Sequence, residues 1–154
     1  MLQFSNYNIT YDLEVPGETC LNLHIAECQN RCCGCFSKEL WESTNEPLFD
    51  CCIKLTIAYL KQISCVCFLG EGKNEDEEHS EFHHLCNILH RLHLKTCLYS
   101  GRDCTIEGWM DCFDYIKVGS YNPDRGPISC SSTNQRIFRK TDNGYQDITS
   151  LLWR

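Results

Sequence analysis

The stretch "CLNLHIAECQNRCCGCF", residues 20–36, joins a strand pattern directly to a cluster of cysteines. Its first six residues alternate apolar and polar side chains, which is the two-residue period of a half-buried strand. Four cysteines then fall within eight positions, and Cys28, Cys32 and Cys35 have the spacing C-x3-C-x2-C. These thiols could form disulfides, bind zinc or bind an iron–sulfur cluster.

Length, composition and charge narrow the class of protein. The chain has 154 residues, of which 42% are hydrophobic and 23% charged, so we expect one globular domain over residues 1–154. It contains no run of about 20 apolar residues and no basic, apolar leader at its start, so we expect no membrane partner and a cytoplasmic location. The formal net charge of -7 and the scattered basic residues argue against a nucleic-acid partner.

Cysteine is unusually abundant, with 14 in the chain. That density is typical of a disulfide scaffold in a small secreted protein. However, several cysteines lie inside strand-like runs, ISCVCFL at 63–69 and KTCLY at 95–99, where cysteine serves as a small buried apolar residue. We therefore interpret most of them as reduced thiols in a reducing cytoplasm.

Beyond the first strand, apolar runs alternate with helical patterns. The sequence predicts further strands at 63–69, 95–100, 113–119 and 135–140, and helices starting at Pro47 and over 76–94. This alternation favours an α/β fold with a parallel sheet, in which sites gather in the loops after the carboxyl ends of the strands. The cysteine cluster, GEGK, YSGR and the loop 119–134 all occupy such positions.

The chemistry of three closely spaced thiolates differs from that of four. Three can hold three irons of a [4Fe–4S] cluster and leave the fourth iron open to chelate S-adenosylmethionine. A structural zinc ion prefers four ligands, and although Cys33 is available, adjacent cysteines rarely converge on one tetrahedral ion.

The stretch PGETCLNLHIAECQNRCCGCFSKELW resembles the N-terminal half of radical S-adenosylmethionine enzymes, and within them the activating proteins of anaerobic, class III ribonucleotide reductases. The resemblance continues through SCVCFLGEG, LYSGRD, FDYIKVGSY, SSTNQRIFR and DITSLLWR. It implies a short, partial (β/α) barrel with mostly parallel strands. It also implies reductive cleavage of S-adenosyl-L-methionine to a 5′-deoxyadenosyl radical, which generates a glycyl radical on the anaerobic ribonucleotide reductase. A flavodoxin- or ferredoxin-type protein would donate the electron.

The same resemblance implies roles for particular residues. The [4Fe–4S] cluster would be held by Cys28, Cys32 and Cys35. The family has a Gly-Gly-acidic turn where this chain has the acidic residue in the middle position. Asn134-Gln135-Arg136 matches a family motif to which we assign no role. The implied contacts to the methionine and ribose of S-adenosylmethionine are Gly70, Glu71, Gly72, Ser100, Gly101 and Lys117.

Other functions stay open at this point. The chain could activate another glycyl radical enzyme, or act as a radical enzyme on a small molecule such as a deazapurine precursor. It could also be a non-catalytic iron–sulfur or zinc module that docks a partner. Five histidines lie on or beside the helix predicted at 76–94, and His79 and His83 have the i, i+4 spacing of a metal pair. They share their face with acidic residues, so we interpret that face as solvated rather than metal-binding.

Overall fold

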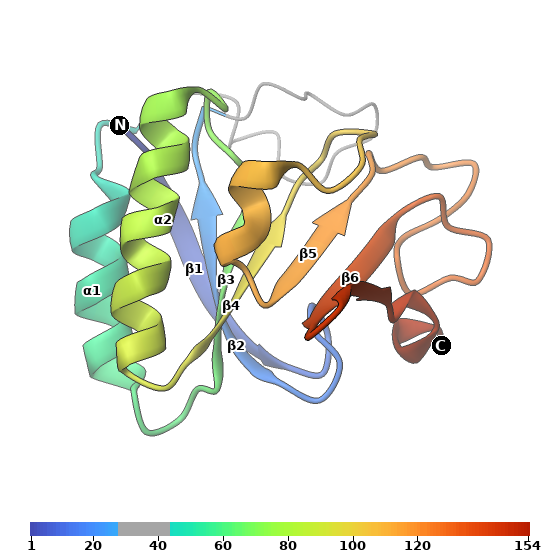
Figure 1. Ribbon diagram of the computed structural model, residues 1–154, viewed down its shortest axis with the longest axis horizontal. Helices are drawn as coiled ribbons and strands as arrows, with labels where there is room; N and C mark the ends of the chain where they lie inside the picture. Colours follow the sequence, from blue (N-terminus) through green and yellow to red (C-terminus); the bar gives the residue numbers. More distant parts are fainter. Residues whose placement is uncertain (28–43) are drawn as a thin grey trace.

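A computed structural model describes residues 1–27 and 44–154, and the ribbon in Figure 1 shows one sheet with two helices packed against it. The strands and helices predicted from the sequence are present in the same order. The elements are β1 (Phe4–Tyr11), β2 (Thr19–Ile25), α1 (Leu48–Tyr59), β3 (Cys65–Leu69), α2 (Asp76–Arg91), β4 (Lys95–Tyr99), η2 (Gly108–Cys112), β5 (Tyr115–Val118), β6 (Arg136–Thr141), β7 (Gly144–Asp147) and η3 (Thr149–Leu152).

The seven strands of the described chain form one open sheet in the order β1 to β7. Neighbouring strands from β2 to β5 are parallel, whereas β1, β6 and β7 run antiparallel to their neighbours. The expectation of mostly parallel strands is therefore wrong for the outer three, and the sheet does not close into a barrel. The connections from β1 to β2 and from β6 to β7 are too short for the crossover that parallel pairing needs. The connection from β5 to β6, residues 119–135, is longer but contains no helix, and β6 returns antiparallel beside β5.

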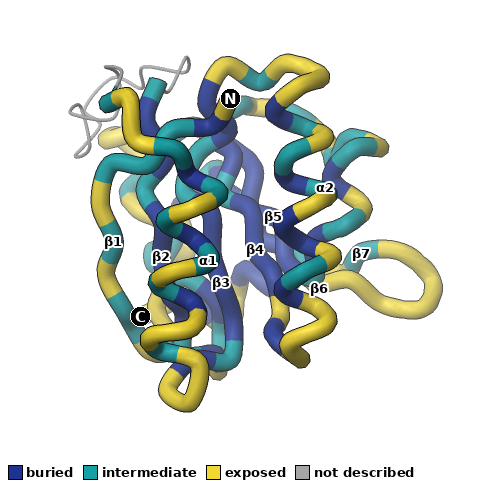
Figure 2. The backbone as a smooth tube through the Cα atoms, turned by 90° about the vertical axis from the view of Figure 1, so that its left-hand side faces the viewer, coloured by how far each residue is buried: buried dark blue, intermediate teal, exposed yellow. Residues whose placement is uncertain are grey.

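Both long helices cover the same face of the sheet (Figure 1), and their outward surfaces are exposed while the strands behind them are buried (Figure 2). Leu23, Phe68 and Leu98 point from successive strands into this core, where the Phe68 ring lies 5.5 Å from that of Phe82 on α2. Each such side chain contributes about 1.5–3 kcal/mol through burial. Helix α2 ends earlier than expected because His93 adopts a left-handed backbone conformation, with φ of 62°.

The opposite face of the sheet, called the inner face below, carries four buried cysteines. Cys20 lies opposite Cys65 on the neighbouring strand, and Cys67 lies opposite Cys97. All four are free thiols. Burial raises the pKa of Cys67 well above its usual value and that of Cys97 to about 11. The interpretation of the cysteines in strand-like runs as small, buried, apolar residues is therefore confirmed.

This burial predicts which described thiols react with an alkylating agent. A thiolate is the reactive species, and burial suppresses both its formation and the access of the reagent. We expect iodoacetamide to label Cys51, Cys104, Cys112 and Cys130 in the native protein, and to label Cys20, Cys52, Cys65, Cys67, Cys86 and Cys97 only after denaturation. Peptide mass spectrometry measures this, and native labelling of Cys67 or Cys97 would contradict the packing of the inner face.

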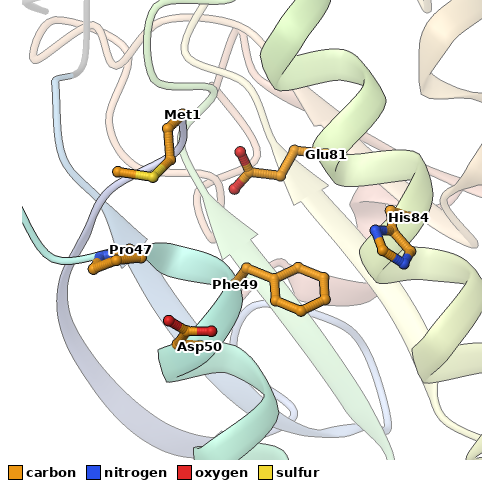
Figure 3. Close-up of a pocket in the computed structure, with 6 residues that line it drawn as sticks. All are labelled: Met1, Pro47, Phe49, Asp50, Glu81 and His84. Atoms are coloured by element: carbon orange, nitrogen blue, oxygen red, sulfur yellow. The ribbon is translucent and has the colours of Figure 1, made fainter.

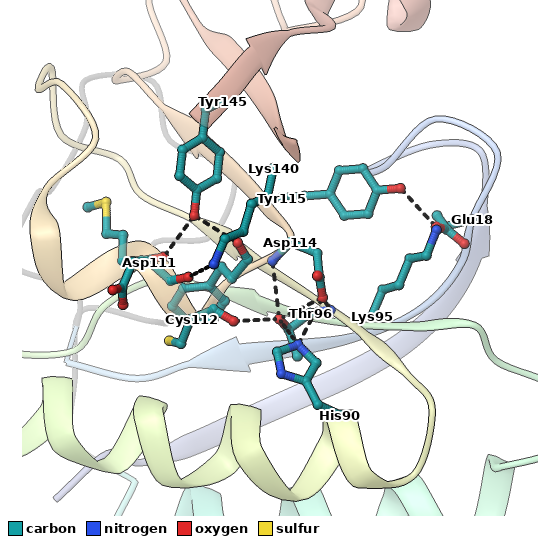
Figure 4. A network of polar contacts seen from close by, with 12 residues as sticks. Glu18, His90, Lys95, Thr96, Asp111, Cys112, Asp114, Tyr115, Lys140 and Tyr145 are labelled. Atoms are coloured by element: carbon teal, nitrogen blue, oxygen red, sulfur yellow. Dashed lines mark hydrogen bonds and ion pairs between the residues drawn. The ribbon is translucent and has the colours of Figure 1, made fainter. Parts of the chain in front are cut away.

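At the amino-terminal edge of the parallel strands, the buried polar side chains satisfy one another (Figure 4). Glu18 accepts hydrogen bonds of 2.9 Å from both Tyr115 and Ser64, and its carboxylate lies 3.2 Å from the amine of Lys95. Asp114 accepts a 2.9 Å bond from the backbone of Thr96. These side chains stabilise the ends of the strands, so we assign this edge a structural role.

One residue near the N-terminus ties together two distant parts of the chain. The carbonyl oxygen of Gln3 accepts a 2.8 Å bond from the backbone of Ala26, at the end of β2. Its side-chain Oε1 accepts the backbone N–H groups of Thr44 and Asn45, at 2.9 and 3.1 Å. Thr44 in turn donates its hydroxyl to the carbonyl of Phe4, at 2.7 Å. Gln3 therefore connects Ala26 with Thr44 and Asn45, which lie in the sequence on the two sides of residues 28–43.

Replacing Gln3 by leucine should remove the two side-chain hydrogen bonds to Thr44 and Asn45. The part-buried N–H of Thr44 and the exposed N–H of Asn45 would lose their acceptor, so we expect the free energy of unfolding to fall by about 1 kcal/mol. Amide hydrogen exchange at Thr44 and Asn45 should accelerate, whereas Gln3→Glu, which keeps an acceptor oxygen, should preserve protection. Equal protection in the leucine variant would show that the side chain contributes nothing to this junction.

Candidate functional site

The loops that follow β3, β4 and β5 meet at the carboxyl edge of the parallel strands, as expected. Backbone hydrogen bonds connect these loops to one another. Gly70 donates to the carbonyl of Tyr99 at 3.0 Å, Ser100 to that of Lys117 at 2.7 Å, and Gly119 to that of Arg102 at 2.7 Å. The loops carrying the predicted contact residues are therefore held in register with one another.

The turn formed by Gly70, Glu71 and Gly72 packs tightly against the body of the protein. Gly72 adopts a φ of 62°, and a Cβ atom there would lie 3.0 Å from the side chain of Leu2. Position 72 thus favours glycine for both backbone conformation and space. Glu71 between the two glycines is buried, with an exposed fraction of 7%.

The Glu71 carboxylate is bound by a guanidinium that the sequence pattern does not identify. Arg102 donates from Nε and Nη2 to the two Glu71 oxygens, at 2.8 and 3.3 Å. The same guanidinium donates to Glu107 at 2.6 and 3.1 Å, and Trp109 adds a 2.8 Å bond to Glu107. Glu71 is therefore committed to Arg102, and an ammonium group arriving at this turn would meet backbone carbonyls or share the carboxylate.

Lys117 and Ser100 lie at the ends of neighbouring strands, and both are buried. The Lys117 amine, on the inner face, donates to the carbonyl of Gly119 at 3.0 Å and to Oε1 of Gln135 at 2.9 Å. It also lies 5.1 Å from the centre of the Tyr99 ring. The Ser100 hydroxyl accepts a 3.2 Å bond from the backbone of Arg102 and so shapes the turn. Gly101 lies within that turn.

The motif Asn134-Gln135-Arg136 begins β6 and faces the same loops. Asn134 donates its amide to the carbonyl of Ser120 at 3.0 Å, and Ser120 donates its backbone N–H and hydroxyl to Asp103 at 2.8 and 2.9 Å. A cleft of about 570 Å³ on the helix-covered side of these loops is lined by Ile106, Val118 and Phe138, among others. Ser120 therefore fastens the loop after β5 to the loop after β4, and Asn134 of the motif holds Ser120 in place.

The three cysteines expected to bind the cluster, Cys28, Cys32 and Cys35, and the neighbouring Cys33 lie outside the described residues. The described chain reaches Glu27, whose carboxylate lies 3.5 Å from the amine of Lys73 beside the glycine turn. No group of metal-binding side chains occurs within residues 1–27 and 44–154. Strand β2 thus ends at the same edge as the other loops, and the predicted cysteines follow it in the sequence.

The ring nitrogens of His79 and His83, the two histidines with the i, i+4 spacing, have different partners. Nε2 of His79 lies 2.7 Å from Oδ1 of Asn74, and its ring stacks on Trp109 at a centroid distance of 3.9 Å. Nε2 of His83 lies 2.7 Å from the carbonyl of Trp109. Burial lowers the pKa of His79. These contacts give both histidines a packing role against η2.

A separate cleft of about 430 Å³ lies between α1 and α2 (Figure 3). Glu81 lines it, accepts a 3.1 Å bond from the backbone of Leu2, and has a pKa raised by burial. Phe49 and His84 form its other wall, with ring centres 5.1 Å apart. This cleft contains none of the predicted site residues.

The fold and this edge define an open-sheet α/β protein with a polar site at the carboxyl ends of parallel strands. No protein-family model, curated protein or solved structure matches the chain. No described helix has the length and apolar character needed to cross a membrane.

The hydrogen bonds from Arg102 to Glu107 predict that the stability of the fold depends on pH. Hydrogen bonds from Arg102, and then from Trp109, lower the pKa of Glu107 from 4.5 to about 2. A lowered carboxyl pKa stabilises the fold above the ordinary value, and this contribution is lost as the pH falls toward the folded value. The advantage in melting temperature of the wild type over Glu107→Gln should be largest above about pH 5 and should vanish near pH 2. Thermal denaturation against pH measures it.

The matched control is Glu75→Gln, which removes one exposed carboxylate from the start of α2. It reports the effect of losing a surface negative charge alone. A difference between wild type and Glu107→Gln that stayed constant over the whole pH range would show that Arg102 does not stabilise the ionised form of Glu107.

Proposed function

We propose that this chain is a radical S-adenosylmethionine enzyme of the class that activates anaerobic ribonucleotide reductases. The observation that carries the proposal is the position of the cysteine motif relative to the loops of the candidate site. Glu27 lies at the edge of the sheet where the glycine turn, Ser100 and Lys117 come together, and in the sequence the C-x3-C-x2-C motif begins directly after it. The cofactors proposed are a [4Fe–4S] cluster and S-adenosyl-L-methionine.

The described residues fit the polar groups of S-adenosylmethionine. Its methionine part carries a carboxylate and an ammonium group. In this proposal the buried Lys117 would bind the carboxylate, and the backbone of the glycine turn would bind the ammonium. Arg102 is already flanked by Glu71 and Glu107, so it is poorly suited to bind a further anion.

When bound, the cluster would supply the electron that breaks the carbon–sulfur bond of the sulfonium. The protein's own residues would orient the ligand and bury it. Lys117 would hold the carboxylate, and the Ser100 turn would fix the loop beside it. The partner would be the glycyl radical subunit of the reductase, with a flavodoxin- or ferredoxin-type electron donor.

The cysteine variants test the metal centre. Cys28→Ser, Cys32→Ser and Cys35→Ser should each abolish cluster binding and S-adenosylmethionine cleavage, because each removes one of three iron ligands. Cys33→Ser is the matched control and should leave both intact. The measurement is iron content together with electron paramagnetic resonance of anaerobically reconstituted, reduced protein, with and without S-adenosylmethionine.

The outcomes separate the competing functions. A [4Fe–4S]⁺ signal that changes on adding S-adenosylmethionine supports the enzyme. Loss of metal binding in Cys33→Ser as well would instead favour a four-thiolate site, such as zinc. A cluster indifferent to S-adenosylmethionine would leave a non-catalytic iron–sulfur module.

A further inference from the structure

The sheet extends beyond the two long helices, and a cleft lies where their cover ends. Helices α1 and α2 lie over one part of the sheet, and β6 lies beyond them (Figure 1). The cleft has a volume of about 570 Å³ and is lined by the loop after β4, the end of β5 and the start of β6. It therefore lies at the carboxyl edge of the parallel strands, beside the candidate site.

The floor of this cleft is apolar. Val118 belongs to the hydrophobic cluster under the helices, and Ile106 and Phe138 pack against that cluster. Ile106 and Phe138 are only half-buried, so the apolar cluster reaches the surface here. Apolar surface gains free energy when another apolar group covers it. The floor thus favours a large apolar side chain.

A cation borders the apolar floor. Arg136 and Phe138 alternate along β6, so their side chains lie on the same side of the sheet, and both line the cleft. The Arg136 side chain is 43% exposed, and its guanidinium contacts Asp147 at 3.9 Å, beyond hydrogen-bond distance. Asp147 itself accepts shorter bonds from Thr149, at 2.6 and 2.9 Å. An exposed ion pair of this length contributes little, so the guanidinium can donate to an incoming anion.

The carboxylate at the rim of the cleft is already engaged. Asp103 accepts the backbone N–H and the hydroxyl of Ser120, at 2.8 and 2.9 Å, and these bonds hold the loops together. Arg102 at the same edge is bound by two carboxylates, whereas Arg136 has the single long contact to Asp147. The cleft therefore suits a ligand that carries an anionic group next to an apolar one.

We propose that this cleft binds a segment of the partner protein in which an acidic residue neighbours a large apolar residue. The acidic side chain would pair with Arg136, and the apolar side chain would cover Ile106 and Phe138. The inference rests on the proposed function, which requires a protein partner to approach this edge of the sheet. It gives Arg136, the last residue of Asn134-Gln135-Arg136, a specific role.

Substitutions of two arginines on the same strand test the contact with the acidic residue. Arg136→Gln removes the cation and should weaken binding of the glycyl radical subunit by roughly ten-fold, and Arg136→Glu should weaken it further. Arg139→Gln and Arg139→Glu are the matched controls. Arg139 is exposed and lies on the opposite side of the sheet, so affinity should stay unchanged. Titration calorimetry with anaerobically reconstituted protein and the unactivated subunit measures the dissociation constant.

A second pair of variants tests the apolar floor without altering the core. Thr105 lines the cleft and is exposed, so Thr105→Trp should fill the cleft and weaken binding, whereas Thr105→Ser should leave it open. All these variants should melt near the wild-type temperature. They should also cleave S-adenosylmethionine at the wild-type rate with dithionite as reductant, because none removes a group assigned to the cofactors.

Cys104 reports directly on whether the partner covers the cleft. Its partly exposed thiol lines the cleft and should react with iodoacetamide in the free protein. A saturating amount of the glycyl radical subunit should slow this alkylation several-fold. Cys51 on α1 is also partly exposed, and it should react at the same rate with or without the subunit. Peptide mass spectrometry measures both rates.

The results separate this inference from the proposed function. Wild-type affinity in a folded Arg136→Glu variant, or undiminished alkylation of Cys104 in the saturated complex, would overturn the docking role while the enzyme proposal stands. Self-association of the wild type that is lost in Arg136→Glu would identify a second copy as the occupant and overturn it as well. A protein that takes up no iron and cleaves no S-adenosylmethionine would defeat the proposed function, and this inference with it.

Discussion

The parallel alignment of β2 to β5 is the constraint on which the rest of the molecule depends. Parallel pairing requires each connection to cross back over the sheet, so the four carboxyl ends lie on one edge. Backbone hydrogen bonds from Gly70, Ser100 and Gly119 then join each loop to the next. A polar site can exist at this edge because the backbone groups of its loops are already satisfied by one another.

Strand alternation divides the sheet's side chains between two different environments. Leucine, isoleucine and phenylalanine face the helices, where large side chains fill the space under α1 and α2. Cysteines occupy the inner face, which also carries Lys117 and Tyr99, and Ile148 and Leu152 pack against them. A free thiol is small and apolar, so neighbouring thiols on adjacent strands fill this face with little volume. The high cysteine count thus includes the buried strand thiols, in addition to the motif after β2 that is proposed to bind the cluster.

The sequence reveals what periodicity and glycine placement can encode. The pattern of ISCVCFL identifies β3, and the acidic start and apolar stripe after Asp76 identify α2. Strand β1 is not predicted, although Tyr7, Ile9 and Tyr11 alternate with polar residues, because this pattern is short and a register shift between Phe4 and Asn6 breaks it. Strand β7 is short and exposed, so it leaves little apolar signal. Its antiparallel pairing follows from the Asn143-Gly144 turn, which is a hairpin signal.

Local sequence patterns also predict only part of the candidate site. The glycine turn, Ser100 and Lys117 could be proposed from their position after strands, together with a family resemblance. The pairing of Arg102 with Glu71 depends on two loops 31 residues apart, and no local pattern encodes that. Nor does local sequence show that Gln135 reaches Lys117, since their contact arises from the antiparallel return of β6 beside β5.

Arg102 and Lys117 at this edge differ in the groups that surround them. Arg102 lies between two carboxylates, so its cluster is an anionic assembly that stabilises the loops. Lys117 donates to the oxygens of Gly119 and Gln135 and lies 5.1 Å from the centre of the Tyr99 ring, contacts that fix the direction of its amine. The antiparallel strand β6, which departs from the expected parallel sheet, begins directly after Gln135 and so brings this oxygen to the end of β5.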